Sequence, residues 1–538
     1  MMFSKPPGAV FRPAEISKMH EYTGNNGPLV TILMPTFNRR RYFPIALASA
    51  VNQAYRNIEI VVVNDGGEDI SDIVNSFADE RIVFINRQVN RGKPYSLNDA
   101  LARAKGKYVC YLDDDDMFYP IHVQKLVNAL ESQPSYQAAY SDLYKVHCTI
   151  DQDGNRTALS KTVEISRDFD RYFLMYFNHV LHVSLMHRRD LLEKTGLYNE
   201  NLQVMIDWDM TRRLAFFTDF IHIHDITGEF YGPVGDCDRI SVKQRKDPAK
   251  YLQNIMSIRM ARPPKPWPKM KDLSIIYAPD LFDHSAVEIL TKIWVFTFHA
   301  FKVVVPIPRS QIDSFKLTMS NLVRLPVDEA LSRIERIDAT LAHCDGEYIA
   351  VVPTNHPVTH AWVEDPLYAL IGNAQLSQAF FLDNLPPGSF GAVFRSNELL
   401  AARKAYPYLD ILQSAQAAGI VVRNPIREEL PFKLDDLLEQ AKQYQADGDC
   451  KSAARIYQHI GANCGNTLWM ETAAANCYFK AGMYSKSLEI ITAVNNNRPI
   501  IDTLVLESRI YQKMNDFERA SRALEQAKSI LQGTLCNA

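Results

Sequence analysis

Four consecutive carboxylates, Asp113 to Asp116, are the residues whose types and spacing point most directly to chemistry. They follow an apolar run, Tyr108 to Leu112, which is typical of a buried strand that ends in a polar loop. Adjacent carboxylates repel one another, so a cation is the expected compensation. Oxygen ligands favour a hard divalent metal ion, and such ions usually bridge to substrate phosphates. The alternative is a solvated acidic turn or the N-terminal cap of a helix.

Polar residues also collect around three other apolar runs, at 29–34, 58–63 and 82–86. Helical patterns at about 42–53 and 95–104 alternate with these predicted strands. The alternation predicts an open α/β sheet, in which ligands bind at the carboxyl ends of the strands. The polar segments at those ends are, in chain order, Pro35-Thr36-Phe37-Asn38-Arg39, Asn64-Asp65-Gly66-Gly67 and Asn90-Arg91-Gly92-Lys93.

Taken together, these segments resemble the family 2 glycosyltransferases, which have the Rossmann-like GT-A fold. The resemblance covers about residues 28–245, and its five elements occur in the order that the family shows. They are Pro-Thr-Phe-Asn-Arg from Pro35, Asn64-Asp65-Gly66, Asn90-Arg91-Gly92, Leu112 with the four aspartates, and Asp207-Trp208-Asp209. The resemblance implies an enzyme that moves a sugar from a nucleoside-diphosphate donor to a hydroxyl acceptor.

The resemblance assigns the nucleotide to the first strand ends. Asp65 corresponds to the family residue that hydrogen-bonds the base. Arg91 and Lys93 are candidates for contacts to the base or the phosphates, although both also fit ordinary surface cations. The loop after the first strand is expected to line the nucleotide pocket with Pro35, Thr36, Asn38 and Arg39.

The resemblance also assigns the metal. Asp113 and Asp115 form an Asp-x-Asp signature, in which Asp113 approaches the ribose or the metal and Asp115 ligates Mn²⁺ or Mg²⁺ on the diphosphate. Such an ion stabilises the leaving group as a Lewis acid. Asp114, near the donor, and Asp116 are secondary candidates. Asp116 alternatively caps a helix that starts near Pro120.

The catalytic base is expected at the start of a later helix. Asp207 is the base by its register, Asp209 lies two residues further on, and Arg213 matches a family arginine that orients the site. Family members usually carry Glu where this chain has Ile206, so the first acid is missing. Both aspartates fall in a first helical turn, where the helix dipole favours an anion, and the alternative is that both are helix caps.

Two histidines follow in the region of the family's second metal ligand. His224 is the candidate to complete the metal shell, and His222 shares its strand face at i, i+2. A structural role is the alternative for either histidine. Arg239 and Ser241 resemble the family's C-terminal segment that closes over the diphosphate.

The composition bounds the class of protein. A chain of 538 residues is too long for one core, so roughly two to four domains are expected. A net charge of −3 implies no strong field for nucleic acid or a membrane surface. The sequence has no apolar run of the roughly 18–20 residues that a membrane span needs, and its start lacks the apolar core of a signal peptide. The eight scattered cysteines fit reduced core residues. We therefore expect a cytoplasmic protein, either free or peripheral to the inner face of the membrane, with no nucleic-acid partner.

Shifts in composition mark the domain boundaries. Residues 1–27 form a polar N-terminal extension, and the catalytic GT-A domain is predicted at 28–260. Four prolines between 263 and 268 cannot continue a helix or a sheet, so a linker is expected at 261–271.

A second domain is predicted from an internal echo. Residues 337–352 parallel 97–112, and at this register Pro353-Thr354-Asn355-His356 replaces the four aspartates. Residues 272–430 are therefore expected to form a degenerate glycosyltransferase-like α/β domain that has lost its metal carboxylates. Chance similarity of one helix–strand unit is the alternative.

The C-terminal part is expected to be all-helical. Gly448 and Gly482 lie 34 residues apart, as do Ala441 and Ala475, and a third unit centres on Asn515. Residues 434–532 are predicted to form tetratricopeptide-like repeats, with a generic helical bundle as the alternative. Such repeats usually bind peptide segments or mediate self-association, so a partner protein or a second copy of the chain is expected.

The sequence thus predicts a metal-dependent glycosyltransferase that inverts configuration, because one base without a nearby nucleophile implies a single displacement. The expected acceptor is a glycan or a protein, as in the synthesis of cell-surface polysaccharide or of a glycosylated flagellar subunit. The alternative is a catalytically inactive scaffold that binds sugar nucleotides and assembles through its helical repeats.

Overall fold

The computed structural model describes residues 27–536, apart from 152–154, 164, 234–246, 314, 316, 318, 360–361, 374–375, 425–439, 442, 464–467, 498 and 500. The predicted N-terminal extension, Arg239 and Ser241 therefore lie outside the described residues. The chain divides into two compact units. A nine-stranded unit contains the first sheet together with the C-terminal helices, and a seven-stranded unit contains residues 175–177 and 244–428.

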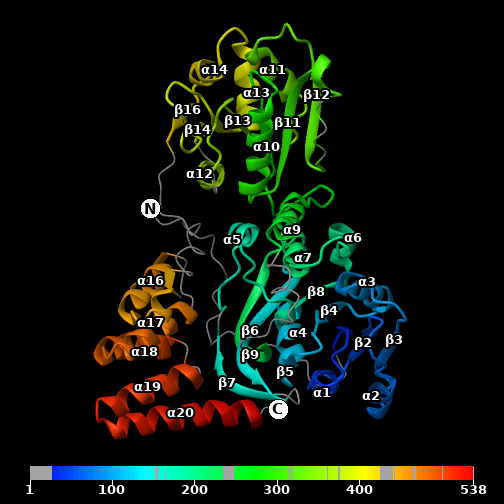
Figure 1. The fold of residues 1–538 in the computed structure, drawn as a ribbon, viewed down its shortest axis with the longest axis vertical. Helices are drawn as coiled ribbons and strands as arrows, with labels where there is room; N and C mark the ends of the chain where they lie inside the picture. The colour runs from blue at the N-terminus through cyan, green and yellow to red at the C-terminus, as the bar shows by residue number, and fades with distance from the viewer. Residues whose placement is uncertain are drawn as a thin grey trace. The chain divides into compact units, whose positions relative to one another are not determined.

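The sheet of the nine-stranded unit has the strand order β3-β2-β1-β4-β8-β6-β9-β5, with β7 beside β6. Its first half, blue in Figure 1, is parallel and alternates with helices. Strands β1 and β2 are buried at every position, which explains their mostly apolar sequences. The buried pair Thr31 and Glu59 interrupts these sequences, and the Thr31 hydroxyl donates a hydrogen bond to the Glu59 carboxylate. These elements are β1 (Val30–Thr36), α1 (Phe43–Val51), β2 (Ile58–Asn64), α2 (Ser71–Ser76), β3 (Ile82–Asn86), α3 (Lys93–Arg103) and β4 (Tyr108–Tyr111).

The second half of this sheet is mixed. Strand β8 runs antiparallel to both β4 and β6, whereas the long strands β6 and β9 run parallel to each other. This mixed sheet resembles the GT-A architecture that the sequence predicts. Its elements are β5 (Met117–Phe118), α4 (His122–Ser132), β6 (Ala138–Ile150), β7 (Arg156–Thr162), α5 (Arg171–Tyr176), β8 (Leu185–Arg188), α6 (Leu192–Thr195), α7 (Ile206–Leu214) and β9 (Phe220–Pro233).

Two local predictions for this unit are wrong. Strand β1 does not break at Pro35, because Pro35 and Thr36 stay in register with Val63 and Asn64 of β2. Asp116 does not cap a helix, because α4 begins at His122 without a side-chain cap. The Asp116 carboxylate instead accepts a hydrogen bond from the backbone N–H of Tyr231, 3.0 Å away, and so ties the acidic loop to β9.

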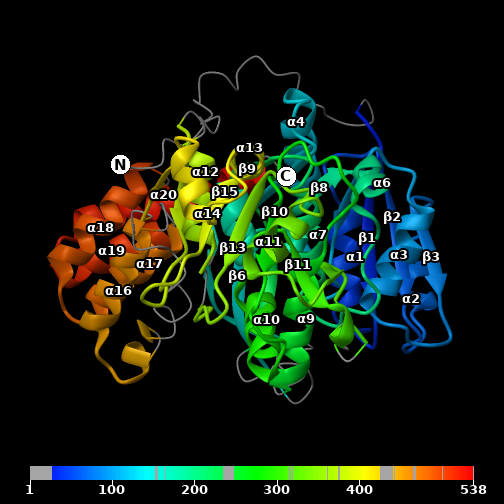
Figure 2. The same ribbon diagram turned by 90° about the horizontal axis from the view of Figure 1, so that it is seen from above.

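The seven-stranded unit, green to yellow in Figures 1 and 2, repeats this topology. Its strand order is β12-β11-β10-β13-β15-β14-β16, and its strands have the same relative directions as β3-β2-β1-β4-β8-β6-β9. The strands are β10 (Leu273–Tyr277), β11 (Phe301–Pro308), β12 (Leu322–Val327), β13 (Tyr348–Val352), β14 (Gln378–Phe381), β15 (Ala392–Arg395) and β16 (Val421–Arg423).

Helices cover both faces of this second sheet. One apolar layer joins alternate β10 side chains to α10 (His284–Phe296) and α12 (Glu364–Gly372). The other layer joins the remaining β10 positions to three further helices. These are α11 (Arg333–Leu341), α13 (Ser396–Ala405) and α14 (Ile411–Ala417). Helix α9 (Pro248–Met260) also groups with this unit, although the sequence predicts it as the end of the first domain.

The echo between residues 97–112 and 337–352 has a structural counterpart. Helix α11 and strand β13 stand in the second sheet where α3 and β4 stand in the first, and Arg333 takes the place of Lys93. The Arg333 guanidinium donates hydrogen bonds to the carbonyl oxygens of Ala278 and Val352, at 3.1 and 3.0 Å. Arg333 therefore joins the ends of β10 and β13, the two strands at the reversal of strand order.

The C-terminal helices, orange to red in Figure 1, stack in chain order, each against its sequence neighbours. The connections at Gly448, Gly482 and Asn515 all have positive φ angles of 82°, 73° and 61°, so they turn the chain in the same way. The helices are α16 (Cys450–Asn463), α17 (Leu468–Lys480), α18 (Tyr484–Asn497), α19 (Ile501–Lys513) and α20 (Phe517–Cys536). Within the described part of the chain, no helix combines the length and the apolar character that a membrane crossing requires.

Each sheet has one glycine that lies too close to the neighbouring backbone for a side chain to fit, and this leads to a stability prediction. A Cβ atom on Gly106 would lie 2.6 Å from the backbone nitrogen of Thr31, and one on Gly346 would lie 2.8 Å from the carbonyl oxygen of Asp272. We expect Gly106→Ala and Gly346→Ala each to lower the free energy of unfolding by about 1–3 kcal/mol, the usual result of overpacking. Chemical denaturation followed by circular dichroism measures the effect.

The matched control is Gly461→Ala in α16, where the nearest neighbour of the new Cβ is the Cβ of Met470, at an ordinary 3.5 Å. Alanine has a higher helix propensity than glycine, so this variant should be at least as stable as the parent chain. Equal stability of all three variants would show that the strands can shift to accept the methyl group.

Candidate active site

The predicted nucleotide and metal residues gather at the carboxyl ends of β1, β2 and β4. The strand order reverses between β1 and β4, and such a reversal opens a crevice at the strand ends. The backbone N–H of Asp65 bonds to the carbonyl oxygen of Thr36, and that of Leu112 bonds to Leu33, so the three ends are held together.

A lysine already neutralises the first acid of the loop. The Lys93 ammonium group, in the first turn of α3, lies 2.6 and 2.7 Å from the two carboxylate oxygens of Asp113. Burial alone would lower the pKa of Lys93, but the charge of Asp113 raises it overall. Lys93, predicted as a contact to the donor, thus holds a positive charge beside the metal motif.

The remaining acids are crowded. Burial and the charge of Asp115 raise the pKa of Asp114 to about 7, although hydrogen bonds from Thr36 and Phe37 support its anion. Burial, followed by the charges of Asp115 and Asp113, raises the pKa of Asp116 well above the ordinary carboxyl range. The loop therefore contains more negative charge than its own neighbours neutralise, which is the setting a divalent cation stabilises.

An arginine that no sequence pattern indicated supports Asp115. The Arg156 guanidinium, at the start of β7, donates to the Asp115 carbonyl oxygen at 2.7 Å and lies 3.6 Å from its carboxylate. It lies over the Tyr42 ring, 3.6 Å from the centroid, and also faces Tyr231 at 4.7 Å. Arg156 belongs to no motif and lies 41 residues after Asp115 in the chain, so only the folded chain brings it to the acids.

Asp65 organises the loop before α3. Its carboxylate accepts hydrogen bonds from the backbone N–H groups of Arg91 and Gly92, at 3.0 and 2.7 Å, and it pairs with Arg87 at 2.8 Å. Gly92 has a φ of 98°, which suits glycine, and it turns the chain into the helix. The exposed Arg91 side chain stacks on the ring of Tyr95, 4.0 Å from its centroid.

The loop after β1 lines a pocket of about 490 Å³. Asn38 has a φ of 53°, and its side-chain oxygen accepts a hydrogen bond from the backbone N–H of Glu68. Arg40 forms an ion pair with Asp72 at the rim. The lining consists of the predicted residues Asn38 and Arg39 together with Arg40, Arg41, Tyr42, Glu68 and Ile73.

Asp207 lies in the first turn of α7 and shares the electrostatic environment of the acidic loop. Burial raises its pKa, while the charge of Lys93 opposes this shift and that of Asp113 adds to it. The side-chain amide of Asn178 donates a hydrogen bond to the Asp207 carboxylate at 2.8 Å, which fixes its orientation. The structure thus brings together Lys93, Asp113 and Asp207, from α3, the acidic loop and α7.

Asp209 and Arg213 form a buried ion pair with each other. The Arg213 guanidinium lies 2.7 Å from the Asp209 carboxylate, and the two side chains are 8% and 2% exposed. Arg213 also donates to the carbonyl oxygens of Thr195 and Gly196 at 2.6 and 3.0 Å. Asp209 is predicted as a catalytic residue and Arg213 as the arginine that orients the site; in the structure this pair ties α7, which also carries Asp207, to the end of α6.

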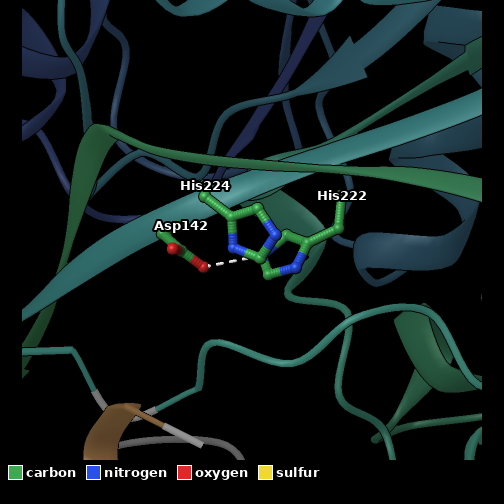
Figure 3. A group of neighbouring side chains, drawn as sticks. All are labelled: Asp142, His222 and His224. Atoms are coloured by element: carbon green, nitrogen blue, oxygen red, sulfur yellow. Dashed lines mark hydrogen bonds and ion pairs between the residues drawn. The ribbon is translucent and has the colours of Figure 1, made fainter. Parts of the chain in front are cut away.

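The prediction that His224 joins Asp113 and Asp115 around one metal is wrong. His224 lies near the start of β9, in the stretch opposite Ser141 and Asp142, whereas the acidic loop contacts β9 at Tyr231, opposite Val146. Along β6, four to five residues separate Ser141 and Asp142 from Val146, so His224 and the acidic loop contact β6 and β9 at points roughly 15 Å apart. That distance is far beyond the reach of one ion. His224 instead lies beside His222 and Asp142 (Figure 3).

Comparisons with known proteins point to a family. Residues 31–193 match the family model described as glycosyl transferase family 2. The chain contains a family 2 glycosyltransferase domain. The family resemblance predicted from the sequence is thereby confirmed over these residues.

Related proteins named as glycosyltransferases occur in several microbes. An uncharacterized glycosyltransferase of Rickettsia prowazekii is 29% identical over 205 residues, which are 37% of this chain and 62% of that protein. One of Methanocaldococcus jannaschii is 29% identical over 189 residues, 34% of this chain and 63% of that protein. One of Haemophilus influenzae is 36% identical over 123 residues, 22% and 38% of the two chains. This chain thus spans less than two thirds of each relative.

Solved structures with a related fold are more distant. Residues 1–349 of TarS from S. aureus, in complex with UDP-GlcNAc, match with a TM-score of 0.35 and 18% identity, over 43% of this chain and 65% of that one. The mannosyltransferase PcManGT from Pyrobaculum calidifontis, in complex with GDP-Man and Mn²⁺, matches with a TM-score of 0.32 and 18% identity, over 46% and 69% of the two chains. Similarity at this level carries no argument about the site.

The contrast between Asp207 and Asp209 can be tested by stability. A carboxyl whose pKa is raised in the folded state destabilises that state at neutral pH, because its charge is less favourable there than in the unfolded chain. Asp207→Asn should therefore leave the free energy of unfolding unchanged or raise it. Asp209→Asn leaves the buried Arg213 charge unpaired and should lower it by about 3–5 kcal/mol.

Urea denaturation of both variants at about pH 7.5 measures these changes. A large loss of stability in Asp207→Asn, with none in Asp209→Asn, would exchange the roles that we give the two residues.

Proposed function

We propose that this chain is an inverting glycosyltransferase that moves a sugar from a nucleoside-diphosphate donor to a hydroxyl acceptor, with a divalent metal at Asp113 and Asp115. The observation that carries the proposal is the shared environment of Lys93, Asp113 and Asp207. The acids that follow β4 suit a metal–diphosphate and lie within the region that matches family 2 glycosyltransferases, and Asp207, whose carboxylate Asn178 orients, feels the charges of Lys93 and Asp113.

The acidic loop fits a metal by its chemistry. Its ligands are all carboxylate oxygens, its charge is only partly neutralised, and Lys93 already places one cation on Asp113. We assign Asp113 and Asp115 as the residues that would hold Mn²⁺ or Mg²⁺. When bound, such an ion supplies Lewis-acid stabilisation of the leaving diphosphate.

The protein residues divide the remaining work. Asp65, Asn38 and Arg39 hold the nucleoside beside β1 and β2, where the 490 Å³ pocket lies. Lys93 and Arg156 add positive charge near the diphosphate. Asp207 takes the proton of the acceptor hydroxyl as that oxygen attacks the anomeric carbon, and a single attack of this kind inverts the configuration.

We further propose that the seven-stranded unit is a glycosyltransferase-like domain without transferase activity. The support is its strand order, and the exchange of the four aspartates for Pro353, Thr354, Asn355 and His356 at the end of β13. The C-terminal helices, which we propose as tetratricopeptide-like repeats, would recruit a glycan-bearing or protein acceptor, or a second copy of the chain. A screen of nucleotide sugars with Mn²⁺, monitored by release of the nucleoside diphosphate, identifies the donor.

The role of the base gives a kinetic prediction. Asp207→Asn should lower kcat by about 10²–10⁴ because it removes the proton acceptor, while the affinity for the donor stays within about twofold. Stopped assays measure kcat, and isothermal titration of the donor with Mn²⁺ measures its affinity. Asp115→Ala is the complementary variant, since it should abolish metal-dependent donor binding. Full turnover in EDTA would sink the metal-dependent mechanism.

The crowded acids give a pH prediction. Asp114, with a pKa of about 7, must lose its proton to contribute its charge to the site, so metal affinity should rise with pH. One pH unit below its pKa, only about a tenth of the Asp114 carboxyl groups are ionised. We therefore expect Mn²⁺ to bind about tenfold more weakly at pH 6 than at pH 8. Calorimetry at both values measures this, and Asp114→Asn should flatten the dependence. A pH dependence of the same size in Asp114→Asn would assign it to another group.

A further inference from the structure

The histidines of β9 form a second cluster of metal-ligating groups, remote from the acidic loop. One ligand atom from each of Asp142, His222 and His224 lies within 4.8 Å of the other two. Asp142 belongs to β6, and the two rings project from β9 toward it (Figure 3). Asp168, from the segment before α5, adds a second carboxylate.

The cluster is held in place on its buried side. His222 Nε2 lies 2.8 Å from the Asp142 carboxylate, and these side chains are only 3% and 1% exposed. Ser166 donates a hydrogen bond to the other Asp142 oxygen at 3.0 Å. The ring of Tyr140 stacks on His222, with centroids 4.6 Å apart and planes within 5°. A carboxylate that orients a histidine in this way is the usual support of a metal ligand.

The cluster is open on its other side. His224 is 54% exposed and Asp168 is 63% exposed, so an ion can enter from solvent. One oxygen of Asp168 lies 3.1 Å from His222 Nδ1 and 3.0 Å from His224 Nε2. Both ring nitrogens of His222 face carboxylate oxygens. A neutral imidazole donates a hydrogen bond through only one nitrogen, so the other nitrogen points its lone pair at a carboxylate oxygen. A cation between these two atoms would relieve their repulsion.

The backbone of β9 is adapted to this arrangement. Ile223 lies opposite Ser141 and Ile226 opposite Asp142, so β9 carries extra residues, including His224, in a bulge. Bulges re-aim side chains, and here the rings of His222 and His224 come within 4.1 Å between centroids. Two neighbouring imidazoles and carboxylate oxygens suit a borderline metal ion such as Zn²⁺ better than Mg²⁺ or Ca²⁺.

We propose that His222 and His224, with the carboxylates of Asp142 and Asp168, form a Zn²⁺ site separate from the Asp113–Asp116 loop. Because an imidazole gives one ion only one nitrogen, one carboxylate ligates the ion and the other orients His222. The ion would fasten the segment before α5 to β9. That segment continues to Asn178, the residue that orients Asp207.

The test is Zn²⁺ and Co²⁺ binding to the full chain without nucleotide. We expect one equivalent of Zn²⁺ to bind, and Co²⁺ at the same site to show the strong visible absorption of a low-coordinate nitrogen–oxygen site. His224→Gln, a change at an exposed side chain, should weaken Zn²⁺ binding at least tenfold and abolish that absorption. Retention of parental Zn²⁺ affinity in His224→Gln, or no stoichiometric binding to the parent, overturns the proposal.

Two controls separate this site from other ligands. His343→Gln alters an exposed histidine of the seven-stranded unit and should leave Zn²⁺ affinity unchanged. Asp113→Asn should also keep the Zn²⁺ site while it loses Mn²⁺-dependent donor binding. Loss of Zn²⁺ in Asp113→Asn, with retention in His224→Gln, would assign the ion to the acidic loop instead.

Discussion

The crowding of negative charge at the end of β4 is the constraint on which the rest of the site depends. Four adjacent carboxylates stay in one loop only because several groups share the charge. Lys93 pairs with Asp113, Thr36 and Phe37 bond Asp114, and Arg156 supports Asp115. These partners come from α3, β1 and β7, so the ends of the elements around the crevice are fixed by the same electrostatic requirement. Strands β1 to β4 form a parallel layer, and the polar residues of the site follow the carboxyl ends of these strands.

Much of this architecture could be predicted from the sequence. The apolar runs locate β1, β2 and β4 because strands buried on both faces are mostly apolar, and the run at 82–86 locates the partly exposed β3. The acidic loop, Asp65 and Asp207 could be assigned because each directly follows or opens a recognisable element. The echo at 337–352 likewise predicts α11 and β13, although no aspartates follow β13 as they follow β4.

Other parts of the site depend on contacts that no local pattern encodes. Arg156 reaches Asp115 from a strand 41 residues later in the chain, and Asn178 reaches Asp207 across 29 residues. Asp209 follows Asp207 by two residues, and a helix turns these two side chains to different sides, so sequence spacing could not show that Asp209 pairs with Arg213 while Asp207 does not. The order of the motifs predicts the region of His224, but it does not show how much of β9 separates His224 from Tyr231, where the acidic loop contacts this strand.

Lys93 and Arg333 occupy equivalent positions in the two sheets, yet they treat the crevice differently. The lysine is a compact charge on a flexible stem, and it pairs with the Asp113 carboxylate. The arginine is fixed by two backbone carbonyl groups and joins the strands that a ligand would have to part. The same position thus carries a charge paired with a carboxylate in the first sheet, and a charge spent on two backbone carbonyl groups in the second.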